Sequence, residues 1–372
     1  MDRREFIKVS GAGVLGLGLA GGLPLEAMSR RQKDAYNMIV LGDTHFDTEP
    51  ASVYHSHYNE PTEWLNRVQR AEFARNGEMW RERCPRLLKR AACLVDENTR
   101  GVLHMGDLIQ GDCGNGAVHR KMLDDVTNSF KASFGGALPL VVVVGNHDIR
   151  GVDAKKVTHE YLPKRMGEEL GLPIAKTTFG YNVGPDAYIV VDFNDPDDAE
   201  VERLLAEYKG ARHSFIVVHG PVFPYDGASC RWFWHGKQDD IRRHFRQELA
   251  RRNAIVLCGH VHRTELADWY GDGGRITQMT FNSVWSKPEL DQYKIISEGA
   301  AQYGTMRASM KRDDGKPIVD ETPLFDEYRE GLKRYSVSPA AGCYKLSVTP
   351  KHVTVDFYAG DSTFLTRQFV LR

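Results

Sequence analysis

Short runs of apolar residues recur along the chain, and each run is followed by glycine or polar residues. These runs are residues 37–41, 101–105, 138–144, 187–193, 214–218 and 254–258. Their length and their content of valine and isoleucine are typical of buried strands. Apolar residues with helical spacing lie between several of them, over residues 86–95, 117–134, 197–208 and 239–252. This alternation predicts an α/β fold with largely parallel strand pairing in its N-terminal half.

The C-terminal part of the chain has a different pattern. Residues 343–348, 353–358 and 363–370 have the alternation of antiparallel strands. Residues 287–336 are rich in charge and poor in strand signals, which indicates a helical or loop insertion. We therefore expect a core over residues 36–286, a polar insertion over 287–336 and terminal strands over 337–372.

The first 28 residues carry an export pattern. Two arginines, at positions 3 and 4, precede two apolar residues and a lysine, and a glycine-rich apolar run follows. This resembles a twin-arginine signal and implies export of the folded chain by the twin-arginine machinery, to the periplasm or cell surface. A good small-x-small cleavage site is missing, so residues 1–28 are either a cleaved signal peptide or an uncleaved anchor. We expect no other contact with a membrane.

The composition excludes several classes of protein. Lysine and arginine total 49 against 50 aspartates and glutamates, so no broad basic face is available for a nucleic-acid polymer. The 16 Phe, 15 Tyr and 6 Trp residues exclude global disorder. Six cysteines without a C-x-x-C pair exclude a zinc ribbon and a disulfide scaffold. We expect Cys113 to be a free, buried or half-buried thiol.

Metal-ligating residue types follow the apolar runs directly. The five segments are Gly42-Asp43-Thr44-His45, Gly106-Asp107, Gly145-Asn146-His147-Asp148, His219-Gly220 and Gly259-His260-Val261-His262. The carboxyl ends of strands form the usual crevice for a site in an α/β sheet. Each segment alone is equally well a turn or a core histidine, but coincidence explains the ordered set poorly. Carboxylates with imidazoles favour manganese, iron, zinc or nickel over magnesium and calcium.

This ordered set resembles the calcineurin-like metallophosphoesterase family over about residues 37–263. The resemblance implies a four-layer α/β/β/α sandwich of two mixed β-sheets flanked by helices, in which residues 337–372 complete the second sheet. It also implies a dinuclear metal site at the C-terminal ends of strands. Carried over by position, one ion would be held by Asp43, His45 and His262, and the other by Asn146, His219 and His260. Asp107 would bridge both ions, and His147, oriented by Asp148, would stay free of metal.

The resemblance implies an exported, metal-dependent phosphoesterase. A hydroxide that bridges the two ions would attack phosphorus, and His147 would protonate the leaving group as general acid. The alternatives are a phosphodiesterase for a cyclic nucleotide or glycerophosphodiester, and an inactive metal-binding scaffold or interaction protein. Seven intact ligand positions argue against the scaffold. Where the related purple acid phosphatases carry D-x-G and G-D-x-x-Y, this chain has His45 and Gln110, which disfavours a ferric–tyrosinate centre.

Two further segments bear on the substrate. Aromatic residues follow His219, and Tyr225, Trp232 and Trp234 either form a wall for a flat leaving group of a small phosphate ester or pack beneath their loop. His55 and His57 lie in a segment over residues 48–78 that we interpret as an insertion. We expect both to be solvent-exposed loop histidines and not ligands of a third metal.

Overall fold

The fold was analysed on a computed structural model. The structure describes residues 34–48, 50, 52–225, 238–288, 296–305 and 322–372. The export pattern over residues 1–28 lies outside the described residues, as do Trp232 and Trp234. Among the described helices, none is both long enough and apolar enough to cross a membrane.

The first of two mixed sheets has six strands in the order β14-β13-β12-β1-β2-β3. Their bounds are β1 (Tyr36–Leu41), β2 (Thr99–His104), β3 (Leu140–Val142), β12 (Gly342–Val348), β13 (Val353–Ala359) and β14 (Arg367–Val370). Strands β1, β2 and β3 are parallel, whereas β12 pairs antiparallel with β1 and starts an antiparallel meander. The beginning and the end of the chain therefore share one sheet.

The second sheet has eight strands in the order β10-β11-β8-β9-β7-β6-β5-β4. Their bounds are β4 (Phe179–Val183), β5 (Asp186–Val191), β6 (Ser214–Val218), β7 (Ile255–Cys258), β8 (Thr264–Gly271), β9 (Gly274–Thr280), β10 (Ser297–Glu298) and β11 (Leu332–Ser338). The central strands β5, β6, β7 and β9 are parallel, and antiparallel strands flank them on both sides.

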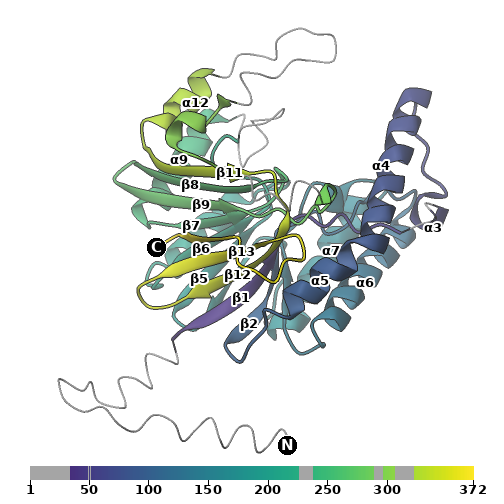
Figure 1. Ribbon diagram of the computed structural model, residues 1–372, viewed down its shortest axis with the longest axis horizontal. Helices are drawn as coiled ribbons and strands as arrows, with labels where there is room; N and C mark the ends of the chain where they lie inside the picture. Colours follow the sequence, from purple (N-terminus) through teal and green to yellow (C-terminus); the bar gives the residue numbers. More distant parts are fainter. Residues whose placement is uncertain (1–33, 49, 51, 226–237, 289–295, 306–321) are drawn as a thin grey trace, which may run out of the picture.

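Helices cover the outer face of each sheet (Figure 1). The six-stranded sheet carries α5 (Cys84–Ala92), α6 (Gly116–Ser133) and α7 (Ala154–Leu170), and the eight-stranded sheet carries α8 (Asp198–Glu207), α9 (Asp239–Arg251) and α12 (Thr322–Arg329). The remaining helical segments are α3 (Ser52–His55), α4 (Glu63–Glu82), and the 3₁₀ turns η1 (His147–Ile149) and η2 (Ala300–Gln302). The predicted fold of two mixed sheets flanked by helices is confirmed.

The parallel strands of the eight-stranded sheet are apolar on both faces because each face packs against a different layer. On β5, Tyr188 and Val190 point into the core between the sheets, and Ile189 and Val191 point into the core under α8 and α9. Tyr188 stacks on Phe215 of the neighbouring strand, with ring centroids 4.6 Å apart. This two-sided burial is why these strands are continuous apolar runs in the sequence.

The expected division of the chain differs from the structure in two respects. Strands over residues 337–372 do form, but β12, β13 and β14 extend the sheet that contains β1, and only the end of β11 belongs to the other sheet. The range 287–336 is not all insertion, because β11 begins at Leu332 and pairs with β8. One lysine and one arginine, the exposed Lys333 and Arg334, hid the strand pattern of β11.

Candidate metal centre

Seven polar side chains meet where five strands end. β1, β2 and β3 of one sheet and β6 and β7 of the other each lead into one of the segments singled out in the sequence. The residues brought together are Asp43, His45, Asp107, Asn146, His219, His260 and His262. The centre thus lies at the carboxyl ends of strands from both sheets, and its assembly requires that the two sheets pack together.

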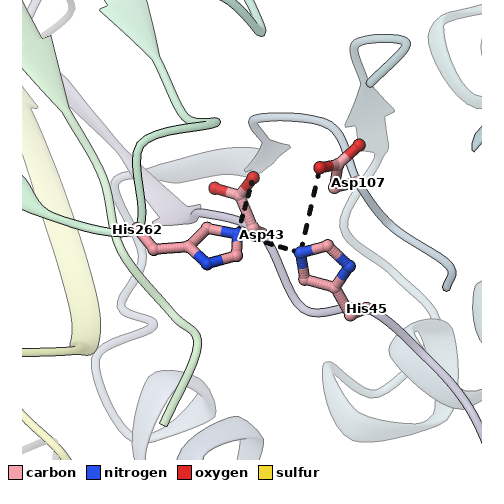
Figure 2. Close-up of side chains that lie close together, drawn as sticks. All are labelled: Asp43, His45, Asp107 and His262. Atoms are coloured by element: carbon pink, nitrogen blue, oxygen red, sulfur yellow. Dashed lines mark hydrogen bonds and ion pairs between the residues drawn. The ribbon is translucent and has the colours of Figure 1, made fainter. Parts of the chain in front are cut away.

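The first cluster contains Asp43, His45, Asp107 and His262, whose side chains face one another in Figure 2. The Nε2 atoms of His45 and His262 lie 3.0 Å apart. His45 Nε2 is 3.8 Å from Asp107 Oδ2, and His262 Nε2 is 3.7 Å from Asp43 Oδ1. Two ligands about 2.1 Å from a shared ion lie about 3–3.5 Å apart at tetrahedral or right angles. The 3.0 Å separation lies in this range, and the two longer ones are below the roughly 4.2 Å that two such bonds can span, so the cluster could hold one metal ion.

The second cluster contains Asp107, His219 and His260. His219 Nε2 lies 3.3 Å from Asp107 Oδ2, 3.2 Å from His260 Nδ1 and 3.2 Å from Asn146 Oδ1. The amide oxygen of Asn146 therefore completes a set of four possible ligand atoms. Because Asp107 belongs to both clusters, the two candidate ion sites are adjacent and share one carboxylate.

The backbone adopts uncommon conformations to place these side chains. His45, Asp107, His260 and His262 all have positive φ, between 48° and 70°. Residues other than glycine rarely occupy this region, and they do so mostly where the surrounding structure holds them for function. Two glycines make the close approach possible. A Cβ atom on Gly145 would lie 2.0 Å from the amide nitrogen of Asp107, and one on Gly106 would lie 2.5 Å from Nδ1 of His219.

Backbone groups fix the orientation of the ligand side chains. The carbonyl of Met105 can only accept, so His219 donates from Nδ1 over 2.6 Å and directs Nε2 into the cluster. Asp43 accepts from the amide of His260 with both carboxylate oxygens at 3.0 Å. Asp107 Oδ1 accepts from the amide of His147 over 2.7 Å, which leaves Oδ2 for the two clusters. Such outer contacts orient metal ligands in advance of binding.

Burial and charge together prepare the centre for cations. Burial lowers the pKa of His260 to about 3 and that of His45 well below its usual value, so both imidazoles are neutral and offer lone pairs. Burial also raises the pKa of Asp43 to about 8. Burial lowers the pKa of His219 too, but the facing carboxylates outweigh it and raise the value to about 9. Without an ion, His219 and Asp43 therefore hold protons that a bound cation would displace. The deprotonated imidazoles and carboxylates are a donor set that suits transition metals, so the residues fit the implied ions.

His147 lies beside the first cluster, and its ring is perpendicular to that of His45 with centroids 4.4 Å apart. Asp148, which we expected to orient His147, forms its side-chain hydrogen bonds with the loop backbone. The Asp148 carboxylate accepts from the backbone amides of Ile109 and Gly145, and the carbonyl of Gln110 bonds to His147 Nδ1 over 2.9 Å. Asp148 lies in η1, and its side chain points toward the backbone of the neighbouring loops. It therefore holds the loops that carry Asp107 and His147.

Aromatic residues border the second cluster. Tyr225, predicted to contact the substrate, is buried with its ring centroid 5.7 Å from that of His260. Phe193, which the sequence analysis did not select, lies 5.4 Å from His219 and 5.8 Å from His260 by the same measure. The sequence feature that could have identified Phe193 is its position at the end of the apolar run 187–193, where the other site residues also follow their strands. Tyr225 and Phe193 form an aromatic border beside the second cluster.

The prediction of exposed loop histidines is wrong for His55. Its imidazole is buried, stacks on Phe73 with centroids 3.6 Å apart, and bonds to the Asp47 carboxylate at 3.0 Å. His57 is exposed. His55 is the last residue of α3, and α4 covers it with Phe73, which the sequence segment alone did not show. Cys113 is a free buried thiol, as expected.

The arrangement of layers and clusters defines a metalloprotein of the α/β class with its site at strand ends. The sequence profile described as calcineurin-like phosphoesterase matches residues 36–264, more than half of the chain. The chain therefore belongs to the calcineurin-like phosphoesterase family and is a dinuclear metal-dependent phosphoric ester hydrolase.

Several solved structures are similar to this chain at low sequence identity. PhoD is 12% identical with a TM-score of 0.50, and the match covers 91% of this chain and 68% of PhoD. Purple acid phosphatase PPD1 from yellow lupin (Lupinus luteus) seeds is 12% identical with a TM-score of 0.49, and the match covers 90% of this chain but 53% of the lupin protein. A dimetal phosphatase from Danio rerio is 11% identical with a TM-score of 0.46, covering 91% and 99% of the two chains. No curated protein matches the sequence significantly.

Proposed function

We propose that this chain hydrolyses a small phosphate ester with His147 as general acid. The observation that carries the proposal is the position of His147 next to two clusters that share Asp107. Asp43, His45 and His262 would hold one ion, and Asn146, His219 and His260 the other. When bound, two divalent ions would lower the pKa of water and neutralise the charge of the phosphate.

His147 and Gln110 would provide the proton for the leaving group. His147 is 9% exposed, so its imidazole is accessible from the site but shielded from bulk water. The Gln110 carbonyl can only accept, and it therefore keeps a hydrogen on Nδ1 and aims Nε2 toward the site. A protonated Nε2 can give its proton to the departing alkoxide, the least stable product of ester cleavage.

The leaving group would lie against the aromatic border. Tyr225 supports this placement by its contact with His260, and Trp232 and Trp234 follow it closely in the sequence. Stacking on such side chains is worth about 1–3 kcal/mol per ring in single-strand binders. A Trp232→Ala, Trp234→Ala double variant should raise KM for a nucleotide-like ester about ten-fold and leave a small aryl phosphate nearly unaffected. An equal loss on both substrates would show that the tryptophans only pack.

The experiment that tests the function is metal analysis of the purified protein with a panel of chromogenic mono- and diesters. We expect two equivalents of manganese, iron or zinc and turnover of at least one ester. A phosphodiesterase acting on cyclic nucleotides or glycerophosphodiesters would turn over diesters alone. A protein that retains two ions but cleaves no ester would be a metal-binding scaffold, and the proposal would be wrong.

Export by the twin-arginine route is part of the same proposal and rests on the pattern of residues 1–28 alone. Cell fractionation of the full chain and of an Arg3→Lys, Arg4→Lys double variant tests it. We expect the unchanged chain in the periplasm or at the cell surface and the variant in the cytoplasm. The same location for both proteins would contradict the proposed route.

A further inference from the structure

The guanidinium of Arg150 contacts the imidazole of His147. Arg150 follows η1 directly, and its side chain is 30% exposed at the edge of the metal centre. The buried carboxylate of Asp112 holds it from one side, with Nε 3.2 Å from Oδ1 and Nη2 2.6 Å from Oδ2. Glu72 lies farther away, at 4.0 Å from Nη2. This side-on pairing occupies Nε and Nη2 and leaves Nη1 directed at His147.

The hydrogen-bond partners of His147 determine which of its ring nitrogens donates and which accepts. Nη1 of Arg150 lies 2.7 Å from His147 Nε2 and 3.0 Å from Nδ1. A guanidinium can only donate, and the Gln110 carbonyl on Nδ1 can only accept. Nδ1 therefore carries the hydrogen, and Nε2 accepts the hydrogen bond from Arg150. In this arrangement Nε2 has no proton to give to a leaving group.

An anion bound at the centre would compete with His147 for the hydrogen bond from Arg150 Nη1. A phosphate oxygen accepts a hydrogen bond from a guanidinium more strongly than a neutral imidazole does, because both partners are charged. Asp112 keeps Arg150 at the edge of the centre while Nη1 changes its partner. The hydrogen bond from Arg150 to His147 Nε2 is then replaced by one to the phosphate oxygen.

We infer that Arg150 binds the phosphoryl group of the substrate and thereby selects phosphomonoesters over phosphodiesters. The inference rests on the proposed function and adds the class of ester to it. A monoester at neutral pH carries two negative charges on three terminal oxygens, whereas a diester carries one charge on two. The monoester thus offers Arg150 an additional acceptor and a stronger attraction.

The test compares the metal-loaded wild type with Arg150→Met and Arg150→Lys. Inorganic phosphate is the probe, and its dissociation constant is measured by calorimetry. Loss of a charge-assisted hydrogen bond predicts phosphate binding about ten-fold weaker or more in Arg150→Met. Arg150→Lys keeps the charge but not the side-on pairing with Asp112, so we expect an intermediate loss. Metal content should match that of the wild type, and the melting temperature of Arg150→Met should fall, because the buried Asp112 carboxylate loses its partner. Binding is therefore measured well below the melting temperature of each protein.

The same proteins are assayed with an aryl monoester and the corresponding bis-aryl diester. We expect the wild type to prefer the monoester and the ratio of kcat/KM values to fall about ten-fold in Arg150→Met. Arg203→Met is the matched control, since Arg203 pairs with Glu200 and Glu207 on the surface of α8, and it should change neither quantity.

The outcomes separate the inference from the function on which it rests. Phosphate affinity within two-fold of the wild type in Arg150→Met would overturn the inference, whether or not the enzyme is active. A wild type that prefers diesters would overturn the assignment of the ester class. In a third outcome, the wild type cleaves neither ester while Arg150→Met binds phosphate more weakly than the wild type does. That result would contradict the proposed function and support the contact between Arg150 and the anion.

Discussion

The metal centre and the ionic cluster between α9 and α12 both bury charged groups, but they balance the charges in opposite ways. In the ionic cluster Arg242, Arg243 and Arg246 of α9 meet Glu327 of α12, at 3.3, 3.1 and 2.7 Å. Asp239 and Asp272 pair with the first and the last of these arginines. Three cations thus meet three anions that belong to the same chain.

The metal centre has no such balance. Its carboxylates and ring nitrogens face one another at distances that allow shared protons, as the 3.0 Å separation of the His45 and His262 Nε2 atoms shows. The same atoms become metal ligands once those protons leave, so a cation from outside completes the centre. We therefore infer that the ionic cluster stabilises the fold, whereas the metal centre binds cations and destabilises the metal-free fold. Four experiments test this contrast.

The largest expected effect is that of metal removal. A chelator should abolish ester hydrolysis and lower the melting temperature by several degrees, because an ion present at 100 times its dissociation constant stabilises the fold by about 2.7 kcal/mol. Scanning calorimetry with and without added manganese or zinc checks this. Unchanged activity in metal-free protein, shown by elemental analysis, would contradict the assignment of the centre.

Asp107→Asn should have the largest effect of any single ligand substitution. Asp107 belongs to both clusters, so losing its charge leaves two cations without their shared anion. Metal affinity should fall by more than the roughly 100-fold that loss of an outer contact causes. Metal titration followed by activity assays measures it, with Asp43→Asn as the comparison. Two retained equivalents of metal and near-normal turnover would show that Asp107 does not bridge.

His147→Ala should keep the metals and lose turnover. Loss of a general acid costs about 10²–10⁴-fold in rate, most severely for alkyl esters, whose leaving groups need a proton. An activated aryl ester should be affected far less. Rates on both esters, with metal content measured on the same preparation, check this. Equal losses on the two esters would indicate that His147 positions the phosphate and does not donate a proton.

Glu327→Gln should lower the free energy of unfolding by about 2 kcal/mol and leave metal content and kcat unchanged, since Glu327 is half-buried among its arginines. Burial raises the pKa of Glu327, but the arginines outweigh it and lower the value to about 2. Because this is below the usual glutamate pKa of about 4.3, the contribution is present above that pH and is lost as the pH falls toward 2.

Urea unfolding at pH 7 and at acidic pH measures both effects of this substitution. The stability difference between wild type and Glu327→Gln should shrink as the solution is acidified. Glu207→Gln on α8 is the control, because its pair with Arg203 is about half exposed on both sides and should contribute little. A difference between Glu327→Gln and wild type that does not depend on pH would show that the glutamate acts by packing and not by its charge.

The features that could be predicted are those encoded within short stretches. Strands β1, β2 and β6 are apolar runs, and each ligand segment follows its strand within a few residues, so chain order and strand direction bring the ligands to one edge. The helix over Ala154–Leu170 was not predicted, because Pro163 lies inside it and its apolar positions do not follow one face clearly. Helix α4 was missed because a segment rich in charge was interpreted as an insertion.

The apolar strands and the ligand segments could be read from the chain alone, because periodicity and motif order are local properties. The order of the ligand segments carried the resemblance to the family, and that resemblance implied the two packed sheets. The tertiary structure alone decided which side chains meet across loops. It placed β12 beside β1 from the other end of the chain, buried His55 against Asp47, turned Asp148 to the backbone, and set Arg150 against His147. Such contacts depend on how separate elements pack, and no spacing within the sequence encodes that packing.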